Sequence, residues 1–346
     1  MKKPFEYQSK PFPKLNLKAL FLVWAYPQGS HRSQLMAETL GMPVEHVYFM
    51  RRQGYLSALL KYPMQSLKTP WVILRHRPSV VFVQNPPVFG ALIVYLWGLL
   101  TGTRFIIDSH TDALLASWWE WSLPLHRFLS HRAITTLVTN EHLYKVVADW
   151  DVSAFILVDP PTTHAERIPV PLDGDFNVVL VSTASYDEPI EAVLTAAANL
   201  SEIQFHITGN FDNTPHHQGV KERAPSNVRF TGYVPDDEFY GLLDAADIVM
   251  SLTTEDHTIQ SGASEALWLG KPVITSDWPV LRHYFSKGAM LVDNSAGSIQ
   301  QAIETIRDNQ PQFQADIMAL QAQRRQEWWE RANLLTGLIL QNLKEC

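Results

Sequence analysis

The chain has 346 residues, of which 46% are hydrophobic, and this is enough for the cores of two domains of ordinary size. The formal net charge of −7 argues against a nucleic-acid partner bound through phosphate neutralisation. A single cysteine, Cys346, excludes an intramolecular disulfide and fits a reducing compartment, so we expect a cytoplasmic protein.

Apolar runs predict four strands in the first half of the chain, at residues 20–24, 80–84, 105–108 and 133–139. Helical segments separate these strands, and the alternation is typical of a doubly wound parallel sheet. The longest apolar run, residues 88–100, is shorter than the roughly 20 residues that cross a bilayer, and it contains two glycines. No membrane-spanning segment is predicted.

The loop after the first predicted strand leads into a helix. Gly29 and Ser30 precede this helix, and Arg32 lies in its first turn. Two interpretations stay open. The three residues bind a phosphate or an acceptor, or they form an ordinary capped helix start with an exposed arginine.

A proline-rich connector at residues 159–171 separates the two halves of the chain. The next predicted strand, residues 176–181, begins a second half in which strands and helices again alternate. Ligands of such sheets bind beyond the carboxyl ends of the strands. The pattern therefore predicts an α/β protein with two doubly wound, Rossmann-like domains, and it directs attention to the loops that follow strands.

The segment at residues 257–277 predicts a polar loop, a short helix and a buried strand. Ser261 and Gly262 open the helix, so unpaired N–H groups can bind an anion, and Gly262 lets a phosphate approach the backbone. Glu265, one turn later, can accept hydrogen bonds from ribose hydroxyls. The alternative is an ordinary capped helix, because the helix dipole alone favours a glutamate at this position.

Together with the strand, helix and strand predicted at residues 228–251, this segment resembles the C-terminal domain of family 4 glycosyltransferases. The resemblance covers residues 176–305. It implies a GT-B fold, in which two Rossmann-like domains face a central cleft and a C-terminal helix crosses back to the N-terminal domain.

On this resemblance we divide the chain into three parts. Residues 1–165 form an acceptor-binding domain, residues 166–325 form a nucleotide-sugar-binding domain, and residues 326–346 form a helix that packs on the N-terminal domain. The last assignment agrees with the amphipathic pattern of the terminal segment.

The resemblance also implies which residues bind the donor. We expect the loops after the strands of the second domain to contribute, with residues 232–234 near the base. The predicted donor-binding residues are Ser182, Thr183, Gly209, Asn210, Tyr233, Val234, His257, Gln260, Ser261, Gly262 and Glu265.

The chain departs from the family 4 pattern at two places. His257 stands where the first glutamate of the Glu-x7-Glu motif is expected, and only Glu265 is kept. The loop from Ser182 to Glu188 is rich in hydroxyl and acidic residues, whereas many family 4 members have an arginine and a lysine there to neutralise the leaving diphosphate. A retaining mechanism is therefore not implied.

Two segments of the first half resemble the eukaryotic β-1,4-mannosyltransferases that act on dolichol-linked chitobiose. They are the Gln-Asn-Pro-Pro element at residues 84–87 and the Ile-Ile-Asp-x-His element at residues 106–110. The hydroxyl-rich loop that begins at Ser182 resembles the same enzymes. This resemblance implies GDP-mannose as the donor and inversion at the anomeric carbon.

Transfer from a nucleotide sugar requires that the leaving diphosphate is stabilised and that the acceptor hydroxyl is deprotonated. Helix N-termini after Ser182-Thr183 and Ser261-Gly262 can serve the first task, with charge from His257 or Arg32.

His110 and Asp112 are the best-placed candidates for the base, although a lone histidine after a strand is more often structural. We expect Asp108 to brace this loop by accepting backbone N–H groups. The chain offers no convincing Asp-x-Asp pattern, and Asp236-Asp237 is better explained as a helix cap, so we expect no metal and no cofactor.

The acceptor is indicated only by apolar and aromatic segments. Residues 92–100 and the cluster Trp118, Trp119 and Trp121 suit a membrane interface and a lipid-linked acceptor. The equal alternative places these aromatic residues in the core or along the sugar cleft. We leave open a peripheral contact at the inner face of the membrane.

The sequence thus predicts a metal-independent, inverting glycosyltransferase that moves mannose from GDP-mannose to a lipid-linked or glycan acceptor. One alternative is a retaining family 4 transferase that uses a UDP-sugar. A second is a non-catalytic GT-B protein that binds a sugar nucleotide and pairs with an active transferase.

Overall fold

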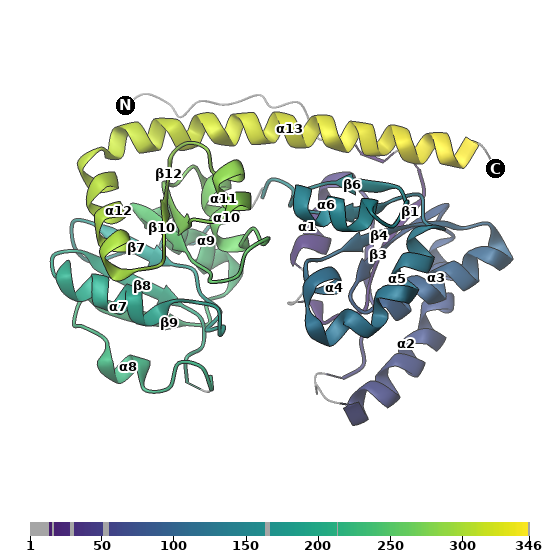
Figure 1. Cartoon of the computed structure of the whole chain (residues 1–346), viewed down its shortest axis with the longest axis horizontal. Helices are drawn as coiled ribbons and strands as arrows, with labels where there is room; N and C mark the ends of the chain where they lie inside the picture. Colours follow the sequence, from purple (N-terminus) through teal and green to yellow (C-terminus); the bar gives the residue numbers. More distant parts are fainter. Residues whose placement is uncertain are drawn as a thin grey trace. The chain divides into compact units, whose positions relative to one another are not determined.

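The computed structural model describes residues 14–15, 17–27, 31–50, 55–162, 167–212 and 214–344 (Figure 1). The chain divides into two compact units. Unit 1 comprises residues 1–160 and 327–346, and unit 2 comprises residues 161–326. The boundary predicted at 165/166 falls within residues 163–166, which lie outside the described part.

Unit 1 contains a six-stranded parallel sheet in the order β2-β1-β3-β4-β5-β6. Its strands are β1 (Ala19–Val23), β2 (Val44–His46), β3 (Val80–Asn85), β4 (Arg104–Ser109), β5 (Thr136–Val138) and β6 (Ala154–Ile156). Its helices are α1 (His31–Leu40), α2 (Tyr55–His76), α3 (Val88–Thr101), α4 (Asp112–Leu115), η2 (Ser117–Ser122), α5 (Leu123–Ser130) and α6 (Glu141–Ala148).

Burial on both faces explains why the strands of unit 1 are continuous apolar runs in the sequence. Phe21 and Val23 of β1 lie in one hydrophobic cluster, whereas Leu20 and Leu22 lie in another on the opposite face. Successive side chains of a strand point to opposite faces of the sheet. When helices cover both faces, every position of the strand is buried and apolar residues are favoured throughout. The doubly wound architecture predicted from the sequence is confirmed.

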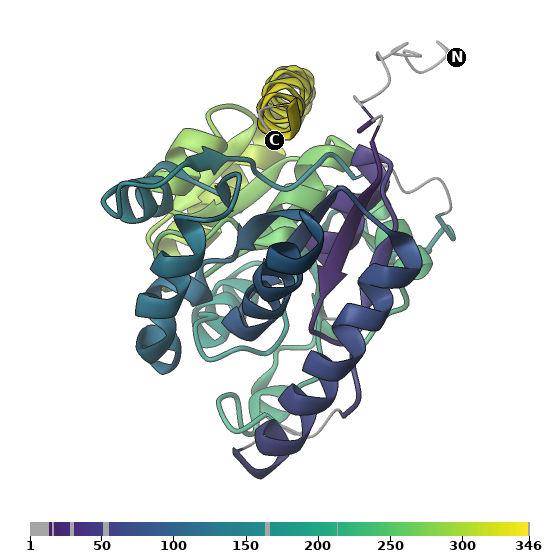
Figure 2. The ribbon, with the colours of Figure 1, turned by 90° about the vertical axis from the view of Figure 1, so that its right-hand side faces the viewer.

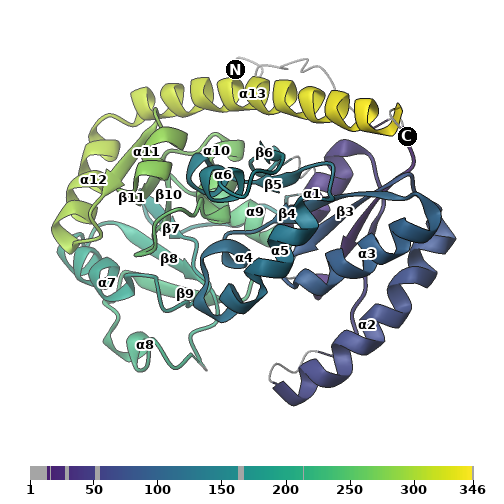
Figure 3. The same cartoon turned by 45° about the vertical axis from the view of Figure 1, so that its right-hand side comes forward.

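Unit 2 repeats this plan with the strand order β12-β11-β10-β7-β8-β9. Its strands are β7 (Asn177–Leu180), β8 (Gln204–Thr208), β9 (Val228–Gly232), β10 (Ile248–Ser251), β11 (Val273–Ser276) and β12 (Ala289–Val292). Its helices are α7 (Ile190–Asn199), α8 (Val220–Arg223), α9 (Asp236–Ala245), α10 (Ser261–Leu269), α11 (Pro279–Tyr284) and α12 (Ala296–Asp308). Figure 3 shows α7 and α12 side by side, and both contribute to the core of this unit.

The last helix, α13 (Gln310–Lys344), contributes to both units along its length. From Glu327 onward it belongs to unit 1, where Trp328, Ala332 and Leu335 are buried in the cluster that contains Phe21. The Trp328 indole N–H donates to the Val158 carbonyl over 3.1 Å. Among the described residues, no helix has both the length and the apolar character needed to cross a bilayer.

A buried histidine lies next to the loop that follows β4. His126 of α5 is fully buried, its Nε2 is 3.4 Å from the Ser109 hydroxyl, and its ring meets Trp150 edge-on. Burial disfavours the charged form and lowers the pKa of His126 to about 4, against a weaker opposing hydrogen bond with the Ala113 backbone.

We therefore expect the fold to lose stability as the pH falls through the range between about 6.5 and 4. The unfolded chain takes up the proton at the ordinary histidine pKa, whereas the folded chain resists it, so acid favours unfolding until both states are protonated. Between pH 7.5 and 5.0 the loss from this residue is about 2 kcal/mol. This loss is measured by comparing the free energy of unfolding in urea of the wild type and of His126→Gln at both pH values. An equal pH dependence of the two proteins would contradict the assignment.

Candidate donor site

The helix predicted to bind an anion is α10. It begins at Ser261 and ends at Leu269. Gly270 is the C-cap residue, and its φ of +69° is the left-handed conformation that glycine adopts easily at a helix end. Gln260 is the N-cap residue, is extended, and makes no side-chain capping bond. The first-turn N–H groups are therefore not satisfied by a side-chain cap, which is the condition for binding an anion at this end.

Gly262 brings the start of α10 against the end of β7. A Cβ at Gly262 would lie 2.5 Å from Val181 Cγ1 and 2.6 Å from Val181 Cβ, much closer than carbon atoms can approach. The sequence interpretation assigned this glycine to close approach by a phosphate. The structure adds a packing reason for a glycine at this position: the missing side chain makes room for Val181.

The loop after β7 contains Ser182 and Thr183. The helix predicted after this loop is α7, which begins at Ile190. The Glu188 carboxylate accepts hydrogen bonds from the Ser182 hydroxyl, from the Thr183 N–H over 2.8 Å and from the Thr183 hydroxyl over 3.0 Å. The donors that we expected to face a diphosphate thus already bind an internal carboxylate, and the helix dipole at this site comes from α10.

The loops after β8 and β9 form the next wall. Gly209 has a φ of +97°, and a Cβ there would lie 2.6 Å from the Ser182 carbonyl oxygen, so only glycine lets the loops after β7 and β8 meet. Its N–H donates to the Gly232 carbonyl over 3.1 Å. Tyr233 follows at the rim and is 74% exposed. A ring so exposed is available to pack on a planar group.

Glu265 lies one turn into α10 and is 8% exposed. It accepts a hydrogen bond from the Tyr240 hydroxyl over 3.2 Å. Burial of Tyr240 and the negative charge of Glu265 both raise the pKa of that tyrosine above its ordinary value, so Tyr240 keeps its proton and remains a donor. This bond orients the Glu265 carboxylate from the core side.

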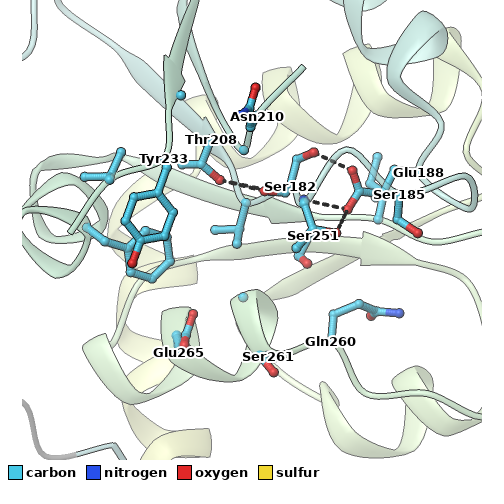
Figure 4. A pocket seen from close by; sticks show the side chains of 18 of the residues that line it. Ser182, Ser185, Glu188, Thr208, Asn210, Tyr233, Ser251, Gln260, Ser261 and Glu265 are labelled. Carbon is cyan, nitrogen blue, oxygen red and sulfur yellow. Dashed lines mark hydrogen bonds between the residues drawn. The ribbon is translucent and has the colours of Figure 1, made fainter. Parts of the chain in front are cut away.

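These walls enclose a pocket of about 620 Å³ within unit 2, which Figure 4 shows from close by. Ser261 and Glu265 come from α10, and Ser182, Thr208 and Tyr233 come from the strand ends opposite. All predicted donor-binding residues but one line the pocket. Those that line it are Ser182, Thr183, Gly209, Asn210, Tyr233, Val234, Gln260, Ser261, Gly262 and Glu265.

The exception is His257. It is not among the residues that line the pocket, and its backbone is left-handed, with a φ of +66°. Its N–H donates to Asp256 Oδ1 over 2.5 Å, and its Nδ1 lies 3.5 Å from the same oxygen. The structure therefore places His257 in a local interaction with Asp256.

Acidic residues that we did not predict also line the pocket, including Asp187 and Glu188. Asp236 lines it as well. It is the first residue of α9, so the helix start predicted at Asp236-Asp237 is confirmed. The N-cap residue itself is Pro235, and Asp237 Oδ1 accepts a hydrogen bond from the Glu238 N–H over 3.0 Å. The lining residues include neither lysine nor arginine. Among the lining residues, donors to an anion are therefore backbone N–H groups and uncharged polar side chains.

The side-chain amide of Gln260 is a further polar group of the pocket. Neither its nitrogen nor its oxygen has a hydrogen-bond partner among the described residues, although both atoms are shielded from solvent. An unsatisfied buried amide is costly, and a bound polar ligand would remove that cost.

The predicted phosphate site of unit 1 has a different structure. Gly29 and Ser30 lie outside the described residues. Arg32 is 8% exposed and donates to Asp108 over 2.9 Å, to Asp159 over 2.5 Å and to the Leu157 carbonyl over 2.9 Å. Arg32 is therefore not the exposed arginine of an ordinary capped helix start, because its guanidinium binds two carboxylates inside the unit.

The candidate base lies beside this ion pair. His110 follows β4, and its Nε2 is 3.4 Å from Asp108 Oδ2. Burial alone would raise the pKa of Asp108, but the charge of Arg32 and the contact with His110 outweigh burial and hold that pKa well below its usual range. Asp108 is thus an anion that faces Arg32 and His110, rather than a brace for backbone N–H groups as we expected. Asp112 is exposed at the start of α4.

The tryptophans after α4 are largely on the surface. Trp118 and Trp121 are 59% and 58% exposed, whereas Trp119 is half-buried and lies 5.9 Å from Trp121 between ring centres. A core position is therefore excluded for Trp118 and Trp121.

Residues 176–309 match the family described as glycosyl transferases group 1. This segment contains the whole pocket. No curated protein matches the chain in sequence. The match and the architecture together make the chain a glycosyltransferase with the GT-B fold.

Solved structures share the fold at low sequence identity. Sucrose-phosphate synthase from Thermosynechococcus elongatus is 16% identical with a TM-score of 0.71, and the match covers 94% of this chain and 99% of that one. HepE from Anabaena, in complex with UDP and glucose, is 14% identical with a TM-score of 0.68 over 95% and 100% of the two chains. A UDP-N-acetylglucosamine 2-epimerase described for Listeria monocytogenes is 12% identical with a TM-score of 0.65, over 95% and 98%.

The contact of Gly262 with Val181 can be tested directly. Gly262→Ala must displace α10 or β7, and overpacking of this kind costs about 1–3 kcal/mol. We expect a lower melting temperature and weaker binding of a nucleoside diphosphate, measured by calorimetry with GDP and UDP. Adding Val181→Ala should restore part of the stability. Gly297→Ala is the matched control, because a Cβ there meets nothing within 4 Å. If the two glycine variants behave alike, the contact does not matter.

Proposed function

We propose that this glycosyltransferase transfers mannose from GDP-mannose to a lipid-linked or glycan acceptor, with inversion and without a metal ion. The observation that carries the donor half of the proposal is the pocket at α10, in which an uncapped helix N-terminus and a buried glutamate lie one turn apart. A nucleoside diphosphate needs these two features, an anion site and an acceptor for ribose hydroxyls.

In the proposed complex the diphosphate lies at the first turn of α10, where backbone N–H groups donate to its oxygens. The Gln260 amide has donors for the same anion and is without a partner in the described structure. Glu265 accepts from the ribose hydroxyls, and the base lies toward Tyr233. The helix dipole favours the developing negative charge on the leaving diphosphate, and it is fixed before the reaction begins.

The acidic loop after β7 bears on how that charge is stabilised. Glu188 occupies the donors of Ser182 and Thr183, so this loop cannot use them on the diphosphate while the carboxylate stays in place. Stabilisation of the leaving group therefore rests on α10. This favours a donor whose diphosphate binds at that helix, and it accounts for turnover without the arginine and lysine of many family 4 enzymes.

For the acceptor we propose His110 as the general base. Inversion is a single displacement: the acceptor oxygen bonds to the anomeric carbon, the bond from that carbon to the diphosphate breaks, and GDP leaves with the electron pair. The acceptor proton passes to His110. Asp108, held as an anion beside Arg32, stabilises the imidazolium that forms.

The donor is tested by incubating the full chain separately with GDP-mannose, UDP-glucose and UDP-N-acetylglucosamine, each with pooled lipid-linked and soluble glycan acceptors. We expect GDP release that depends on the acceptor, a mannosylated product with inverted configuration, and no loss of activity with EDTA. HepE is solved with UDP-glucose, and release of UDP would favour such a donor here. A rise in melting temperature without turnover by any donor would favour a non-catalytic binding protein.

We expect His110→Gln to lower kcat by about 10²–10⁴, because a positioned base contributes that much to a proton transfer. KM for the donor should change little, since His110 is not part of the pocket of unit 2. His131→Gln is the control, because that histidine is exposed on the same unit. Asp112→Asn decides between the two candidates. If His110→Gln keeps full activity and Asp112→Asn loses it, Asp112 is the base.

A further inference from the structure

Helix α2 of unit 1 has polar residues on its core side. Gln65 and Thr69 are buried there, the Gln65 amide donates to the Val47 carbonyl over 2.6 Å, and the Trp24 indole donates to the Thr69 hydroxyl over 2.9 Å. Val72 and Ile73 are buried on the same side. Ordinary surface helices bury their apolar side chains and expose polar ones. Helix α2 departs from this pattern, because it also exposes apolar side chains on the side that faces away from the core.

The opposite side of α2 is apolar and exposed. We call it the α2 outer face and define it by six residues that are 45–80% exposed, namely Leu59, Leu60, Met64, Leu67, Trp71 and Leu74. At about 100° per residue these positions fall within one arc of about 140°. Figure 2 shows α2 in blue along the outside of unit 1. A contiguous exposed apolar face of this kind marks an interaction surface.

Basic residues border the α2 outer face along one edge. Lys61, Lys68 and Arg75 recur every seventh residue and so form a row parallel to the helix axis. Lys68 lies 5.3 Å from the Phe49 ring, and Arg75 lies 5.8 Å from the Trp71 ring. Lysine and arginine can extend their charged ends toward a polar layer while their stems cover apolar surface.

The surrounding sequence is free of acidic residues. Residues 46–107 contain neither aspartate nor glutamate, although the whole chain has a net charge of −7. The lysines and arginines in this range are Arg51, Arg52, Lys61, Lys68, Arg75, Arg77 and Arg104. Residues 46–107 are thus basic although the chain as a whole is acidic, and this part of unit 1 suits an anionic partner.

The apolar surface continues toward the candidate base. The Phe89 ring of α3 lies 5.2 Å from Tyr62 of α2 and 5.8 Å from Trp121 of η2. Exposed Trp118 and Trp121 follow α4, the helix that begins with Asp112. A chain of aromatic contacts therefore joins α2 to η2, which follows the helix that begins with Asp112.

We propose that the α2 outer face docks on the surface of an anionic phospholipid bilayer. The leucines and Trp71 enter the boundary between head groups and acyl chains, and Lys61, Lys68 and Arg75 bind lipid phosphates. A basic row beside leucine and tryptophan, in a stretch of sequence without acidic residues, fits this occupant better than a protein surface. The inference rests on the proposed function, since it places the surface of unit 1 next to a lipid-linked acceptor.

The test is sedimentation of the full chain with vesicles of phosphatidylcholine, with and without 30% phosphatidylglycerol. We expect binding to the anionic vesicles that weakens as salt is raised. Lys61→Gln/Lys68→Gln/Arg75→Gln should weaken binding roughly 100-fold, because each basic residue near an anionic surface contributes several-fold. Leu60→Gln/Leu67→Gln/Trp71→Gln should reduce it at least tenfold. Leu334→Gln/Leu340→Gln, at exposed leucines of α13, is the matched control and should bind as the wild type does.

Two outcomes would overturn the inference. The first is that the wild type fails to sediment with anionic vesicles, and the second is that the α2 variants bind these vesicles as well as the wild type does. Concentration-dependent dimerisation that the apolar α2 variant abolishes, without vesicle binding, would assign the face to a second copy instead. Nucleotide binding and turnover of a water-soluble acceptor by the same variants separate the two proposals. If turnover persists while vesicles are not bound, this inference fails alone, and if turnover is absent from the wild type, the proposed function fails.

Discussion

The donor pocket depends on one close contact, that between Gly262 and Val181. It fixes the first turn of α10 against the end of β7, where the parallel strands of unit 2 end. The opposite walls include the loops that follow β7, β8 and β9, so the position of α10 decides how far its N–H groups lie from those loops. Tyr240 adds a second restraint by binding Glu265. The proposed anion site and the proposed ribose acceptor are therefore held by the core of one unit.

The electrostatics of this pocket set the constraint on mechanism. Its walls contain carboxylates and no lysine or arginine, and Glu188 already takes the donors of the loop after β7. A diphosphate can bind only where backbone dipoles outweigh this negative charge. Two helices begin at the pocket, and α10 is the one without acidic residues in its first turn, whereas α9 begins with Asp236, Asp237 and Glu238. In unit 1 the balance is different, because Arg32 holds Asp108 as an anion beside His110. Each unit thus contains one feature that the proposed displacement requires.

Much of the fold and of the pocket could be predicted from the sequence, because period and spacing determine them. Strand runs buried on both faces identified β1, β3 and β4, and the order of helix signals placed Ser261, Gly262 and Glu265 correctly on α10. Tertiary partners could not be predicted. The sequence does not show that Val181 meets Gly262, that Asp108 binds Arg32, or that Glu188 turns back on Ser182, since these residues are far apart or joined by an irregular loop. The short strands β2 and β6 gave no apolar run long enough to detect.

The most direct test of the donor site is a crystal structure of the full chain with GDP. The account predicts that diphosphate oxygens accept hydrogen bonds from the N–H groups at the start of α10, that the ribose hydroxyls donate to Glu265, and that guanine lies next to Tyr233. A GDP molecule bound with its diphosphate away from α10, or bound outside this pocket, would contradict it.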